Sequence, residues 1–241
     1  MIRIKHLTKI YTGQRAAALE NLTLEIPRGA VFGFLGPNGA GKTTTIKLLL
    51  GLLQPTSGAI EILNGGPQDL AVKKRIGFLP EQPYFYQYLT GWEFLEFCAD
   101  IFALPKEKRE KQIRAVLEKT GLAQEAWQQK IRTYSKGMEQ RLGLAQALIN
   151  DPELVILDEP MSGLDPLGRR EICDLILDLR KEKKTVFFSS HILSDVELLC
   201  THIAILDHGK LLLSGEVKGL KQGKKLSLGE LFLATLAHAR S

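Results

Sequence analysis

The stretch with the clearest chemistry is Gly36 to Thr43, which reads Gly-Pro-Asn-Gly-Ala-Gly-Lys-Thr. Two glycines separated by four residues and followed by lysine and threonine form a complete phosphate-loop pattern. Glycines let successive backbone N–H groups turn toward anionic oxygens, and a helix that starts there adds its positive end. We expect Lys42 to reach the β- and γ-phosphates of a nucleotide and the Thr43 hydroxyl to bind Mg²⁺.

The residues on both sides of this loop provide the context that a phosphate loop requires. Val31 to Leu35 is a short apolar run typical of a strand, and Thr44 to Leu50 places apolar residues at helical spacing. A strand, a glycine loop and a helix in that order direct the backbone donors of the loop toward one point. A chance match in a glycine-rich turn is therefore disfavoured.

A second cluster follows the apolar run Leu154 to Leu157, where Asp158 and Glu159 stand next to each other. Consecutive apolar residues are typical of a central parallel strand that is buried on both faces. Ligands bind at the carboxyl ends of such strands. We expect Asp158 to hold Mg²⁺ through water and Glu159 to polarise a water molecule, in preference to a role as loop or N-cap acids.

Other positions allow two interpretations each. Tyr11 is either a ring that stacks on a base or a surface tyrosine, and Gln82, held between two prolines, is either a ligand for a metal or water or a loop residue. His191 follows an apolar run and either contacts a γ-phosphate or is structural. Ser135 and Gly137 open a helix, where Ser135 is an N-cap or part of a second anion site. Taken singly, these signals leave both interpretations open.

The composition limits the class of protein. The 241 residues are 44% apolar and 24% charged with a net charge of +5, which suits a globular protein with a solvated surface; a weak preference for anionic lipids or nucleotides is the alternative. No apolar run approaches the length of a membrane span, and no signal peptide opens the chain. Cys98, Cys173 and Cys200 are expected to be reduced thiols of a cytosolic protein, and Lys218 to Lys225 an exposed linker.

The order of short runs predicts an α/β fold. Five apolar runs separated by helical patterns favour a mainly parallel sheet covered by helices. Residues 2 to 27 alternate apolar and polar positions and should add an antiparallel layer, and residues 203 to 213 should form a hairpin. From Tyr84 to about Arg132 an all-helical insertion is expected, with two helices separated by Leu104-Pro105. Aromatic residues at its start either pack or face a protein partner: Tyr84, Phe85, Tyr86 and Tyr88.

In their order along the chain, these motifs resemble the ATP-binding cassette (ABC) ATPase family over about residues 1 to 217. The matching motifs are the phosphate loop as Walker A, Tyr11 as the adenine-stacking aromatic, Gln82 as the Q-loop glutamine, Ser135 to Gln140 as a variant signature, Leu154 to Asp158 with Glu159 as Walker B and its catalytic glutamate, Ser162 to Asp165 as the D-loop, and His191 as the switch histidine. The signature carries Lys136 and Met138 in place of Gly and Gln. Its form and the short tail look like the bacterial ABC-2-type export group.

The resemblance implies a domain organisation. Residues 1–217 would form one cassette with a P-loop NTPase (RecA-like) core, in which helices flank a mainly parallel sheet. The cassette would also contain an N-terminal antiparallel β layer and a helical insertion at about residues 84–150. Residues 218–241 would form a short C-terminal tail.

The resemblance also implies a site that binds ATP and Mg²⁺. Its catalytic residues would be Glu159, His191 and Lys42, and its metal ligands Thr43, Gln82 and Asp158. One chain would contact the nucleotide through Tyr11, Gly36, Pro37, Asn38, Gly39, Ala40, Gly41, Lys42, Thr43 and Thr44. A second cassette in a head-to-tail dimer would add Ser135, Gly137 and Met138.

The function implied by the resemblance is that of the ATP-binding and ATP-hydrolysing subunit of an ABC transporter, with export as the direction. ATP-driven closure of the dimer would move a separate integral membrane permease, docked on the aromatic-rich insertion. The chain would lie on the cytoplasmic side of the inner membrane as a peripheral protein, and no nucleic acid partner is expected. The alternative is a soluble single-cassette ABC ATPase that acts in an assembly or translation-related complex.

Overall fold

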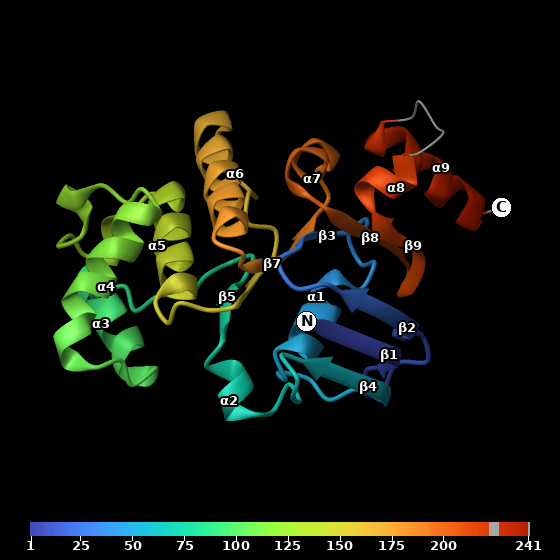
Figure 1. The fold of residues 1–241 in the computed structure, drawn as a ribbon, viewed down its shortest axis with the longest axis horizontal. Helices are drawn as coiled ribbons and strands as arrows, with labels where there is room; N and C mark the ends of the chain where they lie inside the picture. The colour runs from blue at the N-terminus through green and yellow to red at the C-terminus, as the bar shows by residue number, and fades with distance from the viewer. Residues whose placement is uncertain (222–226, 241) are drawn as a thin grey trace. The chain divides into compact units, whose positions relative to one another are not determined.

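The computed structural model describes residues 1–221 and 227–240, which divide into two compact units. Unit 1 consists of Met1–Lys73 and Thr185–Ser241, and unit 2 of Lys74–Lys184 (Figure 1). Unit 1 contains β1 (Ile2–Ile10), β2 (Ala17–Ile26), β3 (Val31–Leu35), α1 (Lys42–Leu49), β4 (Ser57–Ile62), α2 (Leu70–Lys73), β7 (Thr185–Ser190), α7 (Leu193–Leu199), β8 (His202–Asp207), β9 (Lys210–Glu216), α8 (Val217–Lys221) and α9 (Leu228–Arg240). Unit 2 contains β5 (Ile76–Leu79), α3 (Gly91–Ile101), α4 (Lys106–Lys119), two 3₁₀ turns (Gln124–Ala126 and Ile131–Thr133), α5 (Lys136–Leu148), β6 (Leu154–Leu157) and α6 (Pro166–Lys181).

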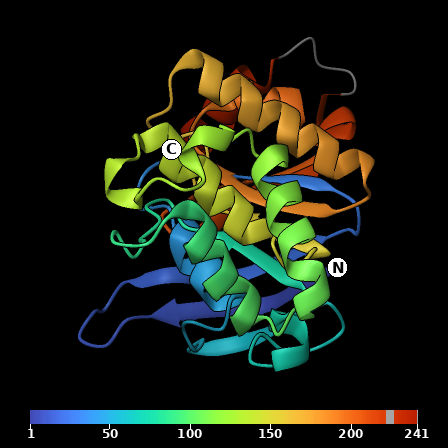
Figure 2. The same ribbon diagram turned by 90° about the vertical axis from the view of Figure 1, so that its left-hand side faces the viewer.

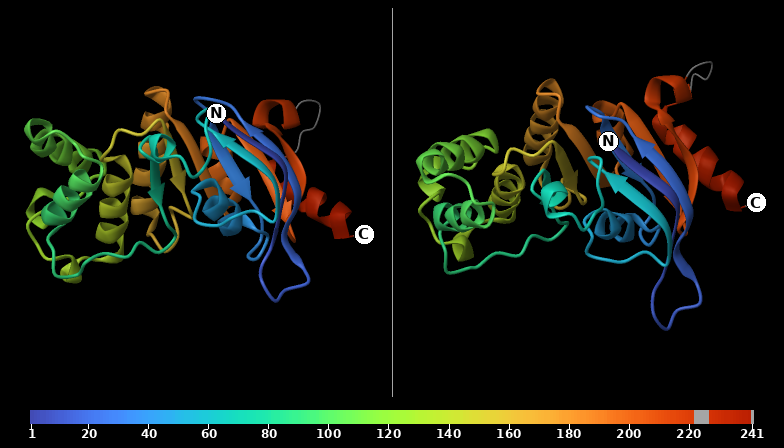
Figure 3. Two further views of the ribbon diagram at one scale, coloured as in Figure 1. Left: turned by 90° about the horizontal axis from the view of Figure 1, so that it is seen from below. Right: turned by 60° about the horizontal axis from the view of Figure 1, so that its bottom comes forward.

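The N-terminal strands form the predicted antiparallel layer. The strand order is β2-β1-β4, and Ile2 pairs with Ile26 on one side and with Ile62 on the other (Figure 3). All three side chains are fully buried, because apolar residues at every second position of a strand face the same side of the sheet.

The core strands of unit 1 run in the order β7-β3-β8-β9. β3 pairs parallel with β7 and with β8, and every residue of β3 and β7 is buried. This burial explains why β3, and Val186 to Phe188 within β7, read as continuous apolar runs in place of an alternating pattern. β8 and β9 form the predicted hairpin, which turns at His208 and Gly209, both with positive φ.

Unit 2 combines the parallel pair β5 and β6 with four helices (Figure 2). The predicted break at Leu104-Pro105 separates α3 from α4. A capping box starts α3, because the Thr90 hydroxyl accepts from the Glu93 N–H while the Glu93 carboxylate accepts from the Thr90 N–H. α5 packs directly on β5, where Gly143 leaves no room for a Cβ beside Leu79.

The basic run after residue 217 differs from its prediction. Residues 218–221, expected in an exposed linker, belong to the helix α8, and residues 222–225 lie outside the described part of the chain. The helix forms there because its apolar residues have a surface to cover: Val217 is buried, and Leu220 lies against Gly215 of β9. The charged pattern of the run obscured these two apolar residues.

The three cysteines are free and buried. Burial raises the pKa of the Cys98 thiol to about 12, so this group stays protonated at physiological pH. Among the described residues, no helix is both long and apolar enough to cross a membrane.

Gly33 in the middle of β3 offers a test of the packing between the sheet and α7. A Cβ at this position would lie 2.7 Å from Cys200 Sγ and 2.9 Å from Val196 Cγ1. We expect Gly33→Ala to lower the free energy of unfolding by about 1–3 kcal/mol through overpacking, measured by urea denaturation. Gly219→Ala is the matched control, because its Cβ would meet nothing within 4 Å and alanine favours a helix. Equal midpoints for the two variants would contradict this account.

Candidate functional site

The phosphate loop lies between β3 and α1 and depends on its glycines. Gly41 has φ +105° and Gly39 has φ +79°, both in the left-handed region that favours glycine. At Gly41 a Cβ would also lie 2.7 Å from the carbonyl oxygen of Ala18, and at Gly36 it would lie 2.5 Å from that of Leu206. The loop is therefore held tightly against neighbouring backbone, and larger residues at Gly36 and Gly41 would force it open.

Lys42 directs its ammonium group back at the loop. The side chain is buried, with 7% of its surface exposed, and Nζ donates to the carbonyl oxygens of Gly36 at 2.8 Å and Pro37 at 3.3 Å. A turn closes the same loop, since the Ala40 N–H donates to Pro37 at 3.2 Å. The cation thus lies at the loop, where phosphate oxygens would compete for its protons, and Thr43 follows it on the first turn of α1.

Tyr11 lies beside the start of α1. Its hydroxyl shares a hydrogen bond of 3.2 Å with the Thr44 hydroxyl, 33 residues away in sequence. Lys9 Nζ lies 5.6 Å from the centre of the Tyr11 ring, within the range of a cation–π contact. Sequence reasoning missed Lys9, although its spacing of two from Tyr11 on an extended segment predicts a common face.

His191 leaves the sheet at the same end as the phosphate loop. β3 and β7 are parallel and pair Leu35 with Ser190, so Gly36 and His191 are the next residues on neighbouring strands. The Ser190 hydroxyl accepts from the Ile192 N–H at 2.9 Å and shapes the turn around His191. The structure therefore brings the switch-histidine candidate to the edge of the sheet that carries the loop.

Unit 2 gathers the acidic candidates in the same way. β5 and β6 are parallel and pair Leu79 with Leu157, and the Asp158 N–H donates to the carbonyl oxygen of Leu79 at 2.8 Å. Asp158 and Glu159 are both buried, whereas Gln82, which follows β5, is exposed. The ends of both strands thus bring the amide and the two carboxyl groups to one edge of this strand pair.

Glu159 has an unusual backbone conformation. Its φ is +48°, in the left-handed region that costs a non-glycine residue about 1–2 kcal/mol. The Ser162 N–H donates to the Glu159 carbonyl oxygen at 3.0 Å, so the turn that follows stabilises this conformation. Backbone strain of this kind is often found at functional sites, and here it fixes how the carboxyl group leaves the strand.

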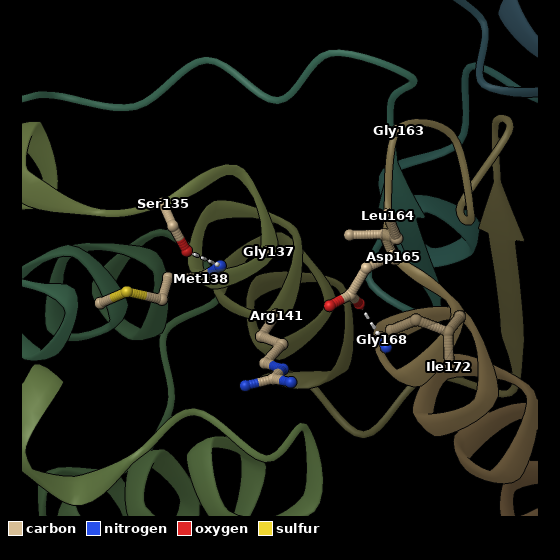
Figure 4. A pocket seen from close by; sticks show the side chains of 9 residues that line it. All are labelled: Ser135, Gly137, Met138, Arg141, Gly163, Leu164, Asp165, Gly168 and Ile172. Carbon is tan, nitrogen blue, oxygen red and sulfur yellow. Dashed lines mark hydrogen bonds between the residues drawn. The ribbon is translucent and has the colours of Figure 1, made fainter.

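Ser135 is the N-cap of α5, since its hydroxyl accepts from the Met138 N–H at 3.3 Å. Asp165 caps α6 in the same manner, accepting from the Gly168 N–H at 2.8 Å. Figure 4 shows the two capping side chains at one cavity of about 220 Å³, lined by Ser135, Gly137, Met138, Arg141, Gly163, Leu164, Asp165, Gly168 and Ile172.

The signature and the D-loop stretches meet in this cavity, which sequence reasoning did not anticipate. The sequence did not identify Arg141 and Ile172 as lining residues of a site. They lie one to two turns along α5 and α6, the helices that begin after Ser135 and Asp165. Lys136 makes a further link, because a Cβ built on Gly163 would lie 2.0 Å from its Nζ. Gly163 has φ +69°, so the variant lysine of the signature lies across a turn that glycine favours.

The candidate metal ligands fit Mg²⁺ by their chemistry. Thr43, Gln82 and Asp158 offer a hydroxyl, an amide and a carboxylate, which are all hard oxygen donors. Mg²⁺ in nucleotide sites is usually held by one or two protein groups together with phosphate oxygens and water. One carboxylate therefore suffices; Thr43 is on the first turn of α1 in unit 1, and Asp158 directly follows β6 in unit 2.

Comparison with known proteins places these motifs in a family. The model of the ABC transporter family matches residues 19–162. The chain is 48% identical over 242 residues to an uncharacterized ABC transporter ATP-binding protein of Synechocystis, covering 95% of this chain and 68% of that protein. It is 46% identical over 215 residues to the bacitracin transport ATP-binding protein of Bacillus licheniformis, covering 88% of this chain and 68% of that protein. The chain thus spans about two thirds of the length of these relatives.

A solved structure shares the fold. A dimeric ATP-binding cassette in a post-hydrolysis state, bound to ADP and Pi, matches with a TM-score of 0.83 at 27% identity, over 90% of this chain and 99% of that one. This match confirms the predicted fold class, a mixed α/β structure with an antiparallel N-terminal sheet and a parallel core.

The positions of Lys42 and Glu159 predict two different defects. Lys42→Ala removes the cation from the phosphate loop and should abolish ATP binding, whereas Glu159→Gln keeps the shape of its side chain and should bind ATP but lose nearly all turnover. Isothermal titration and steady-state phosphate release measure the two properties. Thermal unfolding is the control, because it measures separately the loss of stability, about 1.5–3 kcal/mol for a hydrogen bond of a charged group, that follows from removing the Lys42 hydrogen bonds. Normal binding by Lys42→Ala, or normal turnover by Glu159→Gln, would refute these roles.

Proposed function

This chain belongs to the ABC transporter family as an ATP-binding subunit and ATPase, and we propose that it powers export through a separate membrane permease. The observation that carries the proposal is its 46% identity, over 88% of the chain, to a protein of bacitracin transport. The Ser135 to Met138 form of the signature, similar to that of ABC-2-type exporters, favours export as the direction. The chain would then act at the cytoplasmic side of the inner membrane.

The phosphate loop supplies the cradle and the first cation for ATP hydrolysis. The backbone N–H groups of the loop and the start of α1 surround the phosphates, and Tyr11 stacks on the adenine. Lys42 exchanges the Gly36 and Pro37 carbonyl oxygens for phosphate oxygens and stabilises the charge that develops on the transferred phosphoryl group. His191, at the same end of the sheet, contacts the γ-phosphate and senses its presence.

The residue that activates the attacking water, Glu159, belongs to unit 2. Glu159 orients this water or accepts its proton, and the buried, strained turn that carries the residue limits the directions that its carboxylate takes. Thr43, Gln82 and Asp158 would hold Mg²⁺, which when bound neutralises charge on the β- and γ-phosphate oxygens.

Two chains share each site in this proposal. The chain has two anion-binding helix starts, one at the phosphate loop and one at Ser135 and Gly137. A head-to-tail dimer uses both, because the signature of one subunit closes over the nucleotide held by the other. A related cassette solved as a dimer with ADP and Pi supports this arrangement.

The permease would dock on an aromatic patch, defined here as Tyr84, Tyr86, Tyr88, Phe97 and Ile101. Tyr84 is 90% exposed and Tyr88 69% exposed, while Phe85 in the same segment is buried against Phe94 with ring centres 5.1 Å apart. The Tyr86 ring contacts those of Tyr88 and Phe97 at 6.0 and 5.7 Å, so exposed rings gather on one surface. Exposed aromatic clusters of this kind are typical of protein interfaces.

A mixing experiment tests the shared site. Lys42→Ala destroys the loop and Ser135→Ala the signature, so a dimer of one chain of each kind retains one complete site out of two. We expect each variant alone to be inactive and the mixture to regain ATPase activity, measured by phosphate release. Thr90→Ala is the control for the loss of a helix cap, which costs about 1 kcal/mol without touching the site. A mixture as inactive as its components would contradict a head-to-tail site.

A second experiment tests the docking surface. The double variant Tyr84→Ser and Tyr88→Ser should keep its unfolding midpoint and its basal ATPase activity, because both side chains are exposed. It should no longer co-purify in detergent with a co-expressed candidate permease that the unchanged chain retains. Leu70→Ser serves as the control, since Leu70 is 75% exposed on α2 in unit 1. Unchanged co-purification of the double variant would exclude the aromatic patch as the permease site.

A further inference from the structure

The helix that follows His191 has little of its own to hold it in place. α7 contains only seven residues, and its N-cap residue, Ile192, provides no side-chain hydrogen bond. Helices this short are unstable alone and take their position from packing. The position of α7, and of the His191 turn at its start, therefore depends on the elements that contact it.

The inner side of α7 rests on the sheet. Val196 and Leu199 are fully buried, and Val196 and Cys200 lie against Gly33 of β3. Gly33 is three residues before the phosphate loop, so α7 packs on the strand that carries that loop. This contact sets the distance of α7 from the sheet, and its apolar part is non-directional.

The outer side of α7 is tied to the C-terminal helices by one carboxylate. Glu197 accepts a hydrogen bond from Lys221 Nζ, at the end of α8. The Lys221 hydrogen bond and charge and the Leu228 N–H keep the pKa of this carboxyl below its ordinary value, so the group is ionised at neutral pH. Figure 1 shows α8 and α9 beside β9, close to α7.

The start of α9 is itself well fixed. Ser227 and Glu230 form a reciprocal cap, with the Ser227 N–H donating to the Glu230 carboxylate at 2.7 Å and the Glu230 N–H to the Ser227 hydroxyl at 3.2 Å. Leu228 is fully buried, and Leu193, two residues after His191, lies 3.8 Å from the position of a Cβ on Gly229. The capped start of α9 therefore lies against the first turn of α7.

We propose that Glu197 is a positioning residue, through which the C-terminal helices α8 and α9 brace α7 and hold His191 for its contact with the γ-phosphate. The inference rests on the proposed function, because the role of His191 is taken from that proposal. It also assigns a role to α8 and α9, the described part of the C-terminal tail. The ion pair between Glu197 and Lys221 involves no residue of the phosphate loop. Loss of the brace should therefore lower turnover and leave ATP binding unchanged.

The test compares kcat with KM for ATP in the full-length chain. Glu197→Ala and Lys221→Met should each lower kcat roughly threefold to tenfold, while KM stays within about twofold of its original value. Lys221→Arg keeps the charge and the donor and should restore most of kcat. Glu25→Ala, which breaks the exposed Arg3–Glu25 pair of the β layer, is the matched control and should change neither constant. A fall in unfolding midpoint with normal kcat at lower temperature would show a structural role alone and overturn the proposal.

A double-mutant cycle separates this inference from the function on which it rests. If the brace acts through His191, Glu197→Ala should lower kcat no further in a His191→Ala background. Independent, multiplicative losses would overturn the brace. A His191→Ala variant with normal turnover would instead refute the proposed role of His191, whatever Glu197 does. Loss of turnover in His191→Ala together with normal kcat in Glu197→Ala would refute the brace alone.

Discussion

The parallel pairing of β3 with β7 is the contact on which the nucleotide site of unit 1 depends. It places the Leu35–Ser190 pair at the end of the sheet, so that the phosphate loop and His191 leave from the same edge. Backbone hydrogen bonds between two fully buried strands are costly to break, and a shift of register by one residue would turn every side chain to the other face. The edge that carries the chemistry is thus as rigid as the core beneath it.

Close contacts around that edge explain its special residues. Gly36 and Gly41 meet the backbone of Leu206 and Ala18, and Gly33 meets α7. Unit 2 relies on strain and caps instead, with Glu159 in a left-handed conformation and Ser135 and Asp165 closing two helix starts at one cavity. In both units, candidate sites therefore contain positions that depart from ordinary local preference: Gly39 and Gly41 in unit 1 and Glu159 in unit 2.

Local patterns were sufficient to predict most elements of the fold. The strand before the phosphate loop, the break between α3 and α4 and the Ser135 cap follow from side-chain periodicity and from local hydrogen bonding, which act within a few residues. The prediction of a linker at residues 218–221 was wrong, because Val217 is buried and Leu220 lies against Gly215 of the adjoining strand β9, and a charge pattern does not record such apolar contacts. Lys9 and Arg141 were not identified as candidate site residues from the sequence. Lys9 contacts the Tyr11 ring and Arg141 lines the cavity of unit 2, and both contacts exist only in the folded chain.

The sequence by itself determined which chemical groups the chain has and on which local elements they stand, because a phosphate loop, a buried strand with two acids and a helix cap are all encoded within short segments. Only the tertiary structure decided which of these segments meet. The register of β3 with β7, the meeting of Lys136 with Gly163, and the bond of Glu197 to Lys221 of α8 join residues that no periodicity connects. Such contacts depend on how strands pair and helices pack, which is a property of the whole chain.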